Sequence, residues 1–341
     1  METTAIQLVK NGEAENAFKQ TTITLPDLKD DEVRIEVESF GINYADVMAR
    51  NGLYREAPPL PCVLGYEVVG KVVALGKDVP EDLEGKRVVA FTRFGGYSKH
   101  AQTKYQGVVE IGDYDGGKAL CLATQYVTAF YMSHVATTVQ KGDNVLIHAA
   151  AGGVGTALIQ LLKGKGANII AKTGSDKKFD YLRDLGVENI INYNKSDYTE
   201  QVQKLLKNQR LDVSFNPVAG STFKKDWRLL GNGGSLVLFG GSERSGKKWG
   251  ILSTLNFVRK MGIIIPITLM MRSKSIIGIN MLKVADYKPF TIQHCLTEVV
   301  RLVKDGTLSP QVGASFNASE IDKAHALLES GKSTGKVVLN W

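Results

Sequence analysis

The chain has 341 residues, of which 43% are apolar and 23% charged, as in an ordinary soluble globular protein. Its formal net charge of +7 comes from basic residues spread along the chain, without an arginine-rich stripe or a nucleic-acid motif. A solvated basic surface that attracts anionic ligands is therefore predicted, and no nucleic-acid partner. Three widely separated cysteines exclude a disulfide framework and a paired-cysteine metal site.

The sequence contains no segment that is typical of a signal peptide or a membrane span. The N-terminal residues lack a charged region followed by an apolar one. The most apolar window, Gly262 to Met271, is shorter than the about 20 residues that cross a bilayer. We therefore expect a cytoplasmic protein.

The first 120 residues predict short strands separated by glycine-rich turns. Val33–Val37 alternates apolar and charged residues, as a half-buried strand does, and Val68–Leu75 and Arg87–Phe91 have a similar pattern. Such a stretch is typical of a small β-barrel-like domain.

From Lys118 onward helices and strands alternate. The predicted helices are Ala119–Ser133, Val154–Lys165, Lys177–Leu185, Asp197–Leu206 and Ser221–Leu230. The predicted strands are Asn144–His148, Asn168–Lys172, Asn189–Ile191, Asp212–Phe215, Ser235–Phe239 and Ser275–Ile279. Repeated βα units predict an α/β fold with a parallel, doubly wound six-stranded sheet. The final helix, Ser319–Glu329, and strand, Lys336–Leu339, could return to the first domain.

A glycine-rich loop directly follows the first strand of this alternating region. Residues 149–155 have the sequence Ala-Ala-Ala-Gly-Gly-Val-Gly, and Gly153 and Val154 open the following helix. Gly152 would let a pyrophosphate approach the backbone at the helix N-terminus, and Gly155 would let the helix pack closely on the strand. The strand–turn–helix context favours a dinucleotide site over a tight turn without a ligand.

The end of the second strand indicates which dinucleotide binds. An NAD site places a carboxylate there, about 20 residues after the loop, whereas Ala171–Ser175 contains none. Ser175 can donate to a phosphate, and Lys172 and Lys178 can supply positive charge, which favours the 2′-phosphate of NADPH. Lys178 could equally be a solvated helix lysine. Asp176 does not fit this prediction, because it brings a negative charge near the expected phosphate. We expect it instead to cap the helix that begins at Lys177.

Several ordered motifs resemble one family over nearly the whole chain. They are Gly41-Ile-Asn-Tyr-Ala-Asp46, Asn51-Gly-Leu-Tyr54, Gly65-Tyr-Glu-Val-Val-Gly70, Gly152-Gly-Val-Gly155, Ile191-Asn-Tyr193 and Gly335-Lys-Val-Val-Leu339. Together they resemble the zinc-free quinone oxidoreductase branch of the medium-chain dehydrogenase/reductase family. The segment between Phe239 and Ser275 is most similar to the synaptic vesicle membrane protein (vesicle amine transport protein) subgroup.

The resemblance implies two domains. A GroES-like, partly open β-barrel would comprise residues 1–123 and 303–341. A Rossmann NADPH-binding domain would comprise residues 124–302, with an apolar insertion around 245–274.

Zinc ligands of the related alcohol dehydrogenases are missing here. Tyr66 stands where the family has a histidine, and no cysteine occupies the region Asn43–Asp46. The four-cysteine lobe for structural zinc is also absent from the sequence. Zinc needs three or four ligands of the right type, so we expect no metal.

Without zinc, the resemblance implies hydride transfer from NADPH to a quinone or an α,β-unsaturated carbonyl. It places Asn43, Asp46 and Tyr54 at the catalytic site. Asn43 and Tyr54 can donate hydrogen bonds to a developing oxyanion, and Asp46 would orient its neighbours. Without the resemblance, all three would be ordinary loop residues. We expect Tyr66 and Glu67 to fill the vacated zinc region.

Further cofactor contacts are expected, each with a structural alternative. Thr128 could reach the nicotinamide or lie in a helix interior, and Tyr193 could flank the adenine ribose or pack at a strand end. Lys336 is either a cofactor contact or a surface strand residue. Phe239 and Gly240 end the fifth strand at the sheet edge where ligands bind.

The apolar segment Trp249–Met271 has three interpretations: a wall of the substrate site, a dimer interface, or a lipid-contacting surface. Pro266 argues against one uninterrupted helix. The alternative function is accordingly an NADPH-binding membrane-associated or regulatory protein with weak or lost reductase activity. The edge strand Ser275–Ile279 predicts a homodimer.

Overall fold

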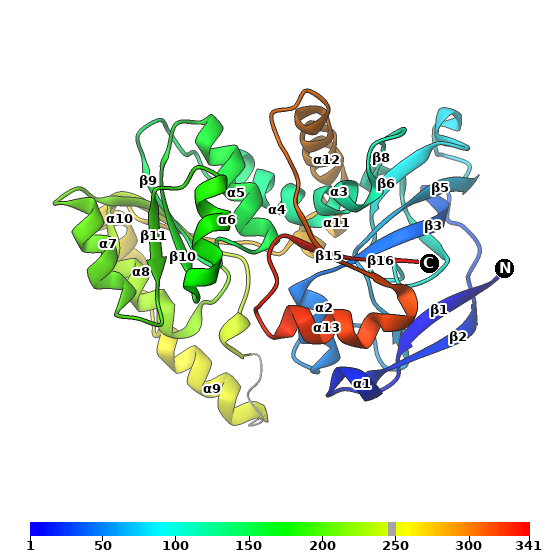
Figure 1. Cartoon of the computed structure of the whole chain (residues 1–341), viewed down its shortest axis with the longest axis horizontal. Coiled ribbons are helices and arrows are strands. Elements are labelled where there is room, and N and C mark those ends of the chain that lie inside the picture. The colour runs from blue at the N-terminus through cyan, green and yellow to red at the C-terminus, as the bar shows by residue number, and fades with distance from the viewer. Residues whose placement is uncertain (245–249) are drawn as a thin grey trace. The chain divides into compact units, whose positions relative to one another are not determined.

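The computed structural model describes residues 1–244 and 250–341 (Figure 1). The chain forms two compact units, the first comprising Met1–Thr128 and Met281–Trp341 and the second Ala129–Asn280. Helices α11 (Met281–Tyr287) and α12 (Pro289–Lys304) thus belong to the first unit, whereas the sequence analysis assigned residues up to 302 to the second. The reason is the apolar face of α12, which packs against β8 (Val108–Glu110) and the segment Leu122–Tyr126 of the first unit.

A seven-stranded sheet forms the centre of the first unit. Its order is β15-β16-β3-β5-β6-β8, and β7 also pairs with β3. The strand bounds are β3 Glu32–Ile42, β5 Glu67–Leu75, β6 Arg87–Phe91, β7 His100–Lys104, β15 Val312–Asn317 and β16 Lys336–Asn340. A smaller sheet has the order β2-β1-β4, with β1 Glu2–Leu8, β2 Phe18–Thr24 and β4 Cys62–Val63. The strands predicted within the first 120 residues are confirmed.

Strand β3 brings distant parts of the chain together at its carboxyl end. It pairs antiparallel with β5, with Phe40 opposite Val68, and antiparallel with β16, with Ile42 opposite Val337. The first residues of β5 and β16 therefore lie on either side of the end of β3. Helix α2 (Tyr44–Arg50) begins there, directly after Asn43.

The second unit contains the predicted parallel six-stranded sheet. Its order is β11-β10-β9-β12-β13-β14, and every pairing is parallel. The strands are β9 Asn144–Ile147, β10 Asn168–Thr173, β11 Asn189–Asn192, β12 Leu211–Asn216, β13 Leu230–Leu238 and β14 Ser275–Gly278. The helices between them are α5 Gly153–Gly164, α6 Phe179–Asp184, α7 Tyr198–Leu206 and α8 Phe223–Leu229. The strand order reverses between β9 and β12, which is where such sheets bind ligands.

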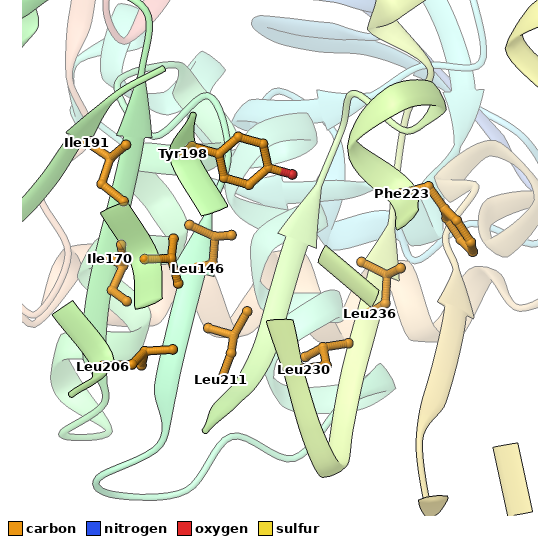
Figure 2. Close-up of a cluster of buried hydrophobic side chains, with 10 residues drawn as sticks. Leu146, Ile170, Ile191, Tyr198, Leu206, Leu211, Phe223, Leu230 and Leu236 are labelled. Atoms are coloured by element: carbon orange, nitrogen blue, oxygen red, sulfur yellow. The ribbon is translucent and has the colours of Figure 1, made fainter. Parts of the chain in front are cut away.

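A cluster of buried side chains joins this sheet to two of its helices (Figure 2). Leu146, Ile170 and Leu236 come from three strands, and Tyr198 and Phe223 begin the two helices. Burial of each large apolar side chain contributes about 2 kcal/mol. The cluster thereby fixes the positions of these strands relative to α7 and α8.

The predicted helix Ala119–Ser133 is interrupted. It consists of α3 (Gly116–Cys121), a π-helical segment at Leu122–Tyr126, α4 (Val127–Phe130) and a second π-helical segment at Tyr131–Ala136. π-Helical turns are rare and occur frequently at functional sites. Hydrophobic periodicity over this stretch could not distinguish them from α-helix.

The apolar insertion forms α9 (Gly250–Met261) and α10 (Pro266–Arg272), and residues 245–249, including the predicted start at Trp249, lie outside the described residues. Pro266 is the first residue of α10, which confirms the predicted break. Among the described residues, one stretch, Thr254–Arg272, is long and apolar enough to cross a membrane by length and composition alone. None of its residues is buried.

Candidate functional site

Asn43, Glu67 and Lys336 form a buried hydrogen-bonded cluster at the end of β3. The Asn43 amide Nδ2 donates to Glu67 Oε1 over 2.7 Å, and Lys336 Nζ donates to Asn43 Oδ1 over 2.9 Å. Lys336 Nζ also forms an ion pair with Glu67 Oε1. Both charged side chains are fully buried, and Asn43 is 8% exposed. The amide therefore bridges two opposite charges that water does not screen.

Gly41 provides the space for this cluster. A Cβ atom at position 41 would lie 2.3 Å from Glu67 Oε1 and 2.4 Å from Lys336 Cε. Any larger residue would displace the ion pair. The glycine of the Gly41–Asp46 motif is thus explained by packing around the charged pair.

Asp46 ties the cluster to the neighbouring loop. Its carboxylate accepts hydrogen bonds from the backbone N–H of Asn43 over 2.8 Å and of Gly65 over 3.1 Å. The side chain is fully buried, and this burial raises the pKa of Asp46 to about 7. These two hydrogen bonds to backbone N–H groups let Asp46 orient the backbone that carries Asn43.

Tyr54 lies in an aromatic group near the same loop. Its ring is edge-on to that of Tyr66, with 6.4 Å between the ring centroids, and Tyr66 lies 5.2 Å from Phe94 by the same measure. Tyr54 is half-buried, and burial raises its pKa to about 12. The phenol therefore stays protonated at neutral pH and can donate a hydrogen bond.

Two residues of this cluster differ from what their sequence positions predict. Glu67 was expected only to fill the vacated zinc region, and a surface position was one alternative for Lys336, which its burial excludes. A lysine that opens a run of buried strand residues, Val337, Val338 and Leu339, was the available signal. It pointed to a buried charge that needs a partner.

Zinc does not fit this arrangement. Glu67 Oε1 is paired with the ammonium of Lys336, and Glu67 Oε2 is buried without a hydrogen-bond partner among the described residues. Tyr66 precedes Glu67 in the sequence where a histidine ligand would be needed. Within the described ranges, no three His, Cys, Asp or Glu side chains are grouped as a metal site. The polar groups of this cluster are an ion pair and an amide, which are not the set of side chains that binds zinc.

The predicted glycine loop joins β9 to α5 at the point where the strand order reverses. A Cβ atom at Gly155 would lie 2.6 Å from Ala149 O, Ala150 Cα and Ala150 O, so the helix packs directly on the turn. A Cβ at Gly152 would meet only Ala149 O, at 3.2 Å. Neighbouring atoms therefore require a glycine at position 155, whereas at position 152 a Cβ would be tight against one carbonyl oxygen only. The lack of a side chain at position 152 would let a pyrophosphate approach the backbone.

The loop after β10 lies beside the glycine loop, because Ala150 N donates to Lys172 O over 3.1 Å. Ser175 caps the turn 176–178, with its Oγ accepting from Lys177 N, so the prediction that Asp176 is the cap was wrong. Asp176 instead accepts from Asn192 Nδ2 over 2.7 Å and pairs with Lys195. Its negative charge is thus compensated by a residue that follows β11.

Lys178 and Tyr193 lie at the same edge of the sheet. Lys178 is half-buried, and burial lowers its pKa. Tyr193 is 48% exposed, and its hydroxyl lies over Gly174, where a Cβ would come within 2.6 Å of it. Lys178 lies in the turn after β10, directly following Ser175-Asp176-Lys177, and Tyr193 directly follows β11.

Lys172 is buried, in contrast to the expected phosphate contact. Its Nζ lies 3.1 Å from His148 Nδ1 and 3.7 Å from the centroid of the Tyr198 ring. His148 Nε2 in turn lies 2.9 Å from Asp226 Oδ2, and Tyr198 donates to Asp226 Oδ1 over 2.7 Å. Burial lowers the pKa of Lys172 to about 8, with Asp226 opposing this change.

This pKa predicts a pH-dependent stability. Between pH 8 and 10.5 the unfolded chain would bind more protons at Lys172 than the folded chain, so its contribution to the free energy of unfolding rises with pH. We expect a rise of about 1–2 kcal/mol from this residue between pH 8 and 9.5. Urea unfolding of the wild type and of Lys172→Met at both pH values measures it. An identical pH dependence in the two proteins would contradict the assignment.

The remaining predicted cofactor residues occupy strand ends and a helix. Phe239 follows β13 and donates its N–H to Asn216 O over 3.2 Å, beside the reversal point. Gly240 packs on the chain after β12, because a Cβ there would lie 2.6 Å from Pro217 O. Packing is therefore sufficient to explain the glycine at position 240. Thr128 is 8% exposed in α4, in the first unit.

Two family models match the chain. The model described as zinc-binding dehydrogenase matches residues 153–305, and the alcohol dehydrogenase GroES-like domain matches residues 29–130. The first match begins at Gly153, within the glycine loop, and contains the six-stranded sheet apart from β9, and the second contains β3, α2, β5 and Glu67. Each match thus falls largely within one of the two units.

Individual relatives agree with these models. The synaptic vesicle membrane protein VAT-1 homolog of Danio rerio is 28% identical over 322 residues, covering 92% of this chain, which spans 65% of that relative's length. Quinone oxidoreductase-like protein 2 of Bos taurus is 30% identical over 312 residues, covering 91% of this chain and 85% of the relative. Among solved structures, Escherichia coli quinone oxidoreductase complexed with NADPH has the same fold, with a TM-score of 0.85 at 24% identity over 99% of this chain and 100% of that one.

Proposed function

The chain belongs to the medium-chain dehydrogenase/reductase family, and from this premise we propose that it is an NADPH-dependent reductase of quinones or α,β-unsaturated carbonyls that acts without zinc. The observation that carries the proposal is the glycine loop at the reversal point of the sheet. At position 152 a Cβ atom would have one close neighbour, the Ala149 carbonyl oxygen at 3.2 Å, while residue 155 is required by packing.

The second unit fits NADPH. Gly152, Gly153, Val154 and Gly155 would hold the pyrophosphate at the N-terminus of α5, where backbone N–H groups lack intrahelical acceptors. Ser175, Lys178 and Tyr193 would hold the 2′-phosphate end. The pairing of Asp176 with Lys195 supports NADPH over NADH, because no uncompensated carboxylate stands at the end of β10.

The first unit would supply the groups that act on the acceptor. Bound NADPH would supply the hydride. Asn43 and Tyr54 would donate hydrogen bonds to the acceptor oxygen that gains negative charge, and that oxygen would then take a proton from solvent. Asp46, fully buried and bonded to backbone N–H groups, would hold Asn43 in place.

Tyr54→Phe is expected to lower kcat by about tenfold to a hundredfold while changing NADPH affinity little, because only the phenolic donor is lost. Steady-state kinetics with a quinone and fluorescence titration with NADPH measure the two quantities. Tyr105→Phe is a suitable control, since Tyr105 lies after β7 and away from the aromatic group of Tyr54. Unchanged kcat for Tyr54→Phe would remove Tyr54 from the mechanism.

The function is tested by titrating NADPH and NADH separately and then following nicotinamide absorbance with a panel of quinones and enones. Tighter NADPH binding and acceptor-dependent oxidation are expected. Tight NADPH binding without oxidation by any acceptor would contradict reductase activity and favour the second candidate below.

The second candidate is an NADPH-binding, membrane-associated or regulatory protein. It is favoured by the exposed apolar side chains around α10, where Ile263 is 94%, Met270 75% and Met271 78% exposed. A homodimer in which the edge strand β14 pairs with a second copy would place β14 in a continuous sheet. Size-exclusion chromatography with light scattering, followed by flotation with lipid vesicles, distinguishes a dimer from lipid binding.

A further inference from the structure

The amide of Asn43 has only one orientation that satisfies both of its charged neighbours. A lysine ammonium has donors and no acceptor, and an ionised carboxylate has acceptors and no donor. Oδ1 must therefore face Lys336 and Nδ2 must face Glu67, as the 2.9 Å and 2.7 Å contacts show.

This orientation determines which group of Asn43 remains for a ligand. The single carbonyl oxygen faces Lys336, and one of the two Nδ2 hydrogens is donated to Glu67. The other Nδ2 hydrogen has no acceptor among the hydrogen bonds of the described residues. Asn43 thus presents a donor and no acceptor, which suits a carbonyl or enolate oxygen better than a hydroxyl hydrogen.

Lys336 and Glu67 meet Asn43 without reaching solvent. Both are fully buried, and the cluster is closed on one side by Gly41, which has no side chain. Neither charged group is exposed enough to contact a substrate directly. Their ion pair and hydrogen bonds are with each other and with the amide, through Glu67 Oε1, while Glu67 Oε2 is buried without a hydrogen-bond partner in the part of the chain that the structure describes.

We propose that the Lys336–Glu67 ion pair is a positioning device that holds the Asn43 amide with its free N–H toward the oxygen of a carbonyl acceptor. The inference rests on the proposed reductase function. Lys336 and Glu67 are positioning residues, and Asn43 is the catalytic residue through which they act. The expected contact of Lys336 with the cofactor is replaced by this role.

The test is a double-mutant cycle in the full chain. Glu67→Gln/Lys336→Met replaces both charges together and leaves a neutral partner for Asn43, so that the amide can take either orientation. We expect kcat to fall about tenfold with the NADPH dissociation constant unchanged. In an Asn43→Ala background, the same pair of substitutions is expected to change kcat by less than about twofold, because the effect passes through Asn43.

A matched control separates positioning from loss of structure. Arg50→Met/Glu329→Gln removes the ion pair between α2 and α13 (Ile321–Glu329) in the same unit, where Arg50 is 1% exposed. It is expected to lower the unfolding temperature without changing kcat by more than about twofold.

The outcomes distinguish this inference from the proposed function. If the wild-type protein does not oxidise NADPH in the presence of any acceptor, both the proposed function and the positioning role are overturned. An active wild type in which the Glu67→Gln/Lys336→Met losses are equal with and without Asn43 overturns the positioning role alone. A weakened NADPH affinity in that double variant would instead assign Lys336 to the cofactor.

Discussion

Gly155→Val is expected to lower the unfolding temperature of the second unit by roughly 6–12 °C. The added Cβ would lie 2.6 Å from three backbone atoms of Ala149 and Ala150, which belong to the turn between β9 and α5 and cannot rotate away. Overpacking of this kind costs about 3 kcal/mol, which corresponds to that change in Tm for a unit of this size. Thermal unfolding followed by circular dichroism measures it.

Gly152→Ala is the matched variant in the same loop. Gly152 has φ −83° and ψ 170°, a conformation that alanine adopts readily, and its Cβ would have one neighbour at 3.2 Å. We expect Tm to change by less than about 2 °C while the NADPH dissociation constant rises about tenfold or more, because the methyl group occupies the path of the pyrophosphate. Equal losses of stability in the two variants would contradict the separation of a packing glycine from a ligand-facing one.

Lys336→Met is expected to lower the free energy of unfolding by about 3–5 kcal/mol, because it leaves the Glu67 carboxylate buried without its counter-charge. Urea denaturation at constant pH measures the change. Glu67→Gln/Lys336→Met should recover most of the loss, since no unpaired charge remains buried.

The control for this prediction is Lys323→Met, which breaks the pair with Glu320 on the protein surface, where Lys323 is 65% exposed. Exposed pairs of this kind contribute about 0–1 kcal/mol. If Lys336→Met costs no more than Lys323→Met, the buried pair does not stabilise the fold as the geometry indicates.

Features that depend on short stretches of sequence could be predicted. The six parallel strands follow from βα repeats, and the glycine loop follows from its position after β9. The break at Pro266 follows from the chemistry of one residue. In each case the pattern is carried by short segments of neighbouring residues.

Features that depend on residues far apart in the sequence could not be predicted. Lys336 and Glu67 are 269 positions apart, and only the pairing of β16 and β5 with β3 brings them together. Asp176 was assigned to a helix cap because its neighbour Lys195 after β11 could not be seen from local sequence. Similarly, α12 was assigned to the wrong side of the boundary because its packing partners come from Tyr105–Glu110 and Leu122–Tyr126.

The first unit consists of the two ends of the chain, Met1–Thr128 and Met281–Trp341, so it cannot be completed on the ribosome until translation is nearly finished. Glu67 is made early, but its counter-charge arrives on β16, after all of Ala129–Asn280 has been translated. Until then the nascent barrel carries a carboxylate that cannot be buried at low cost, and the end of β3 lacks the neighbouring strand. Because domains fold as their residues emerge, the nucleotide-binding unit can form first, while the unit that begins the chain closes last.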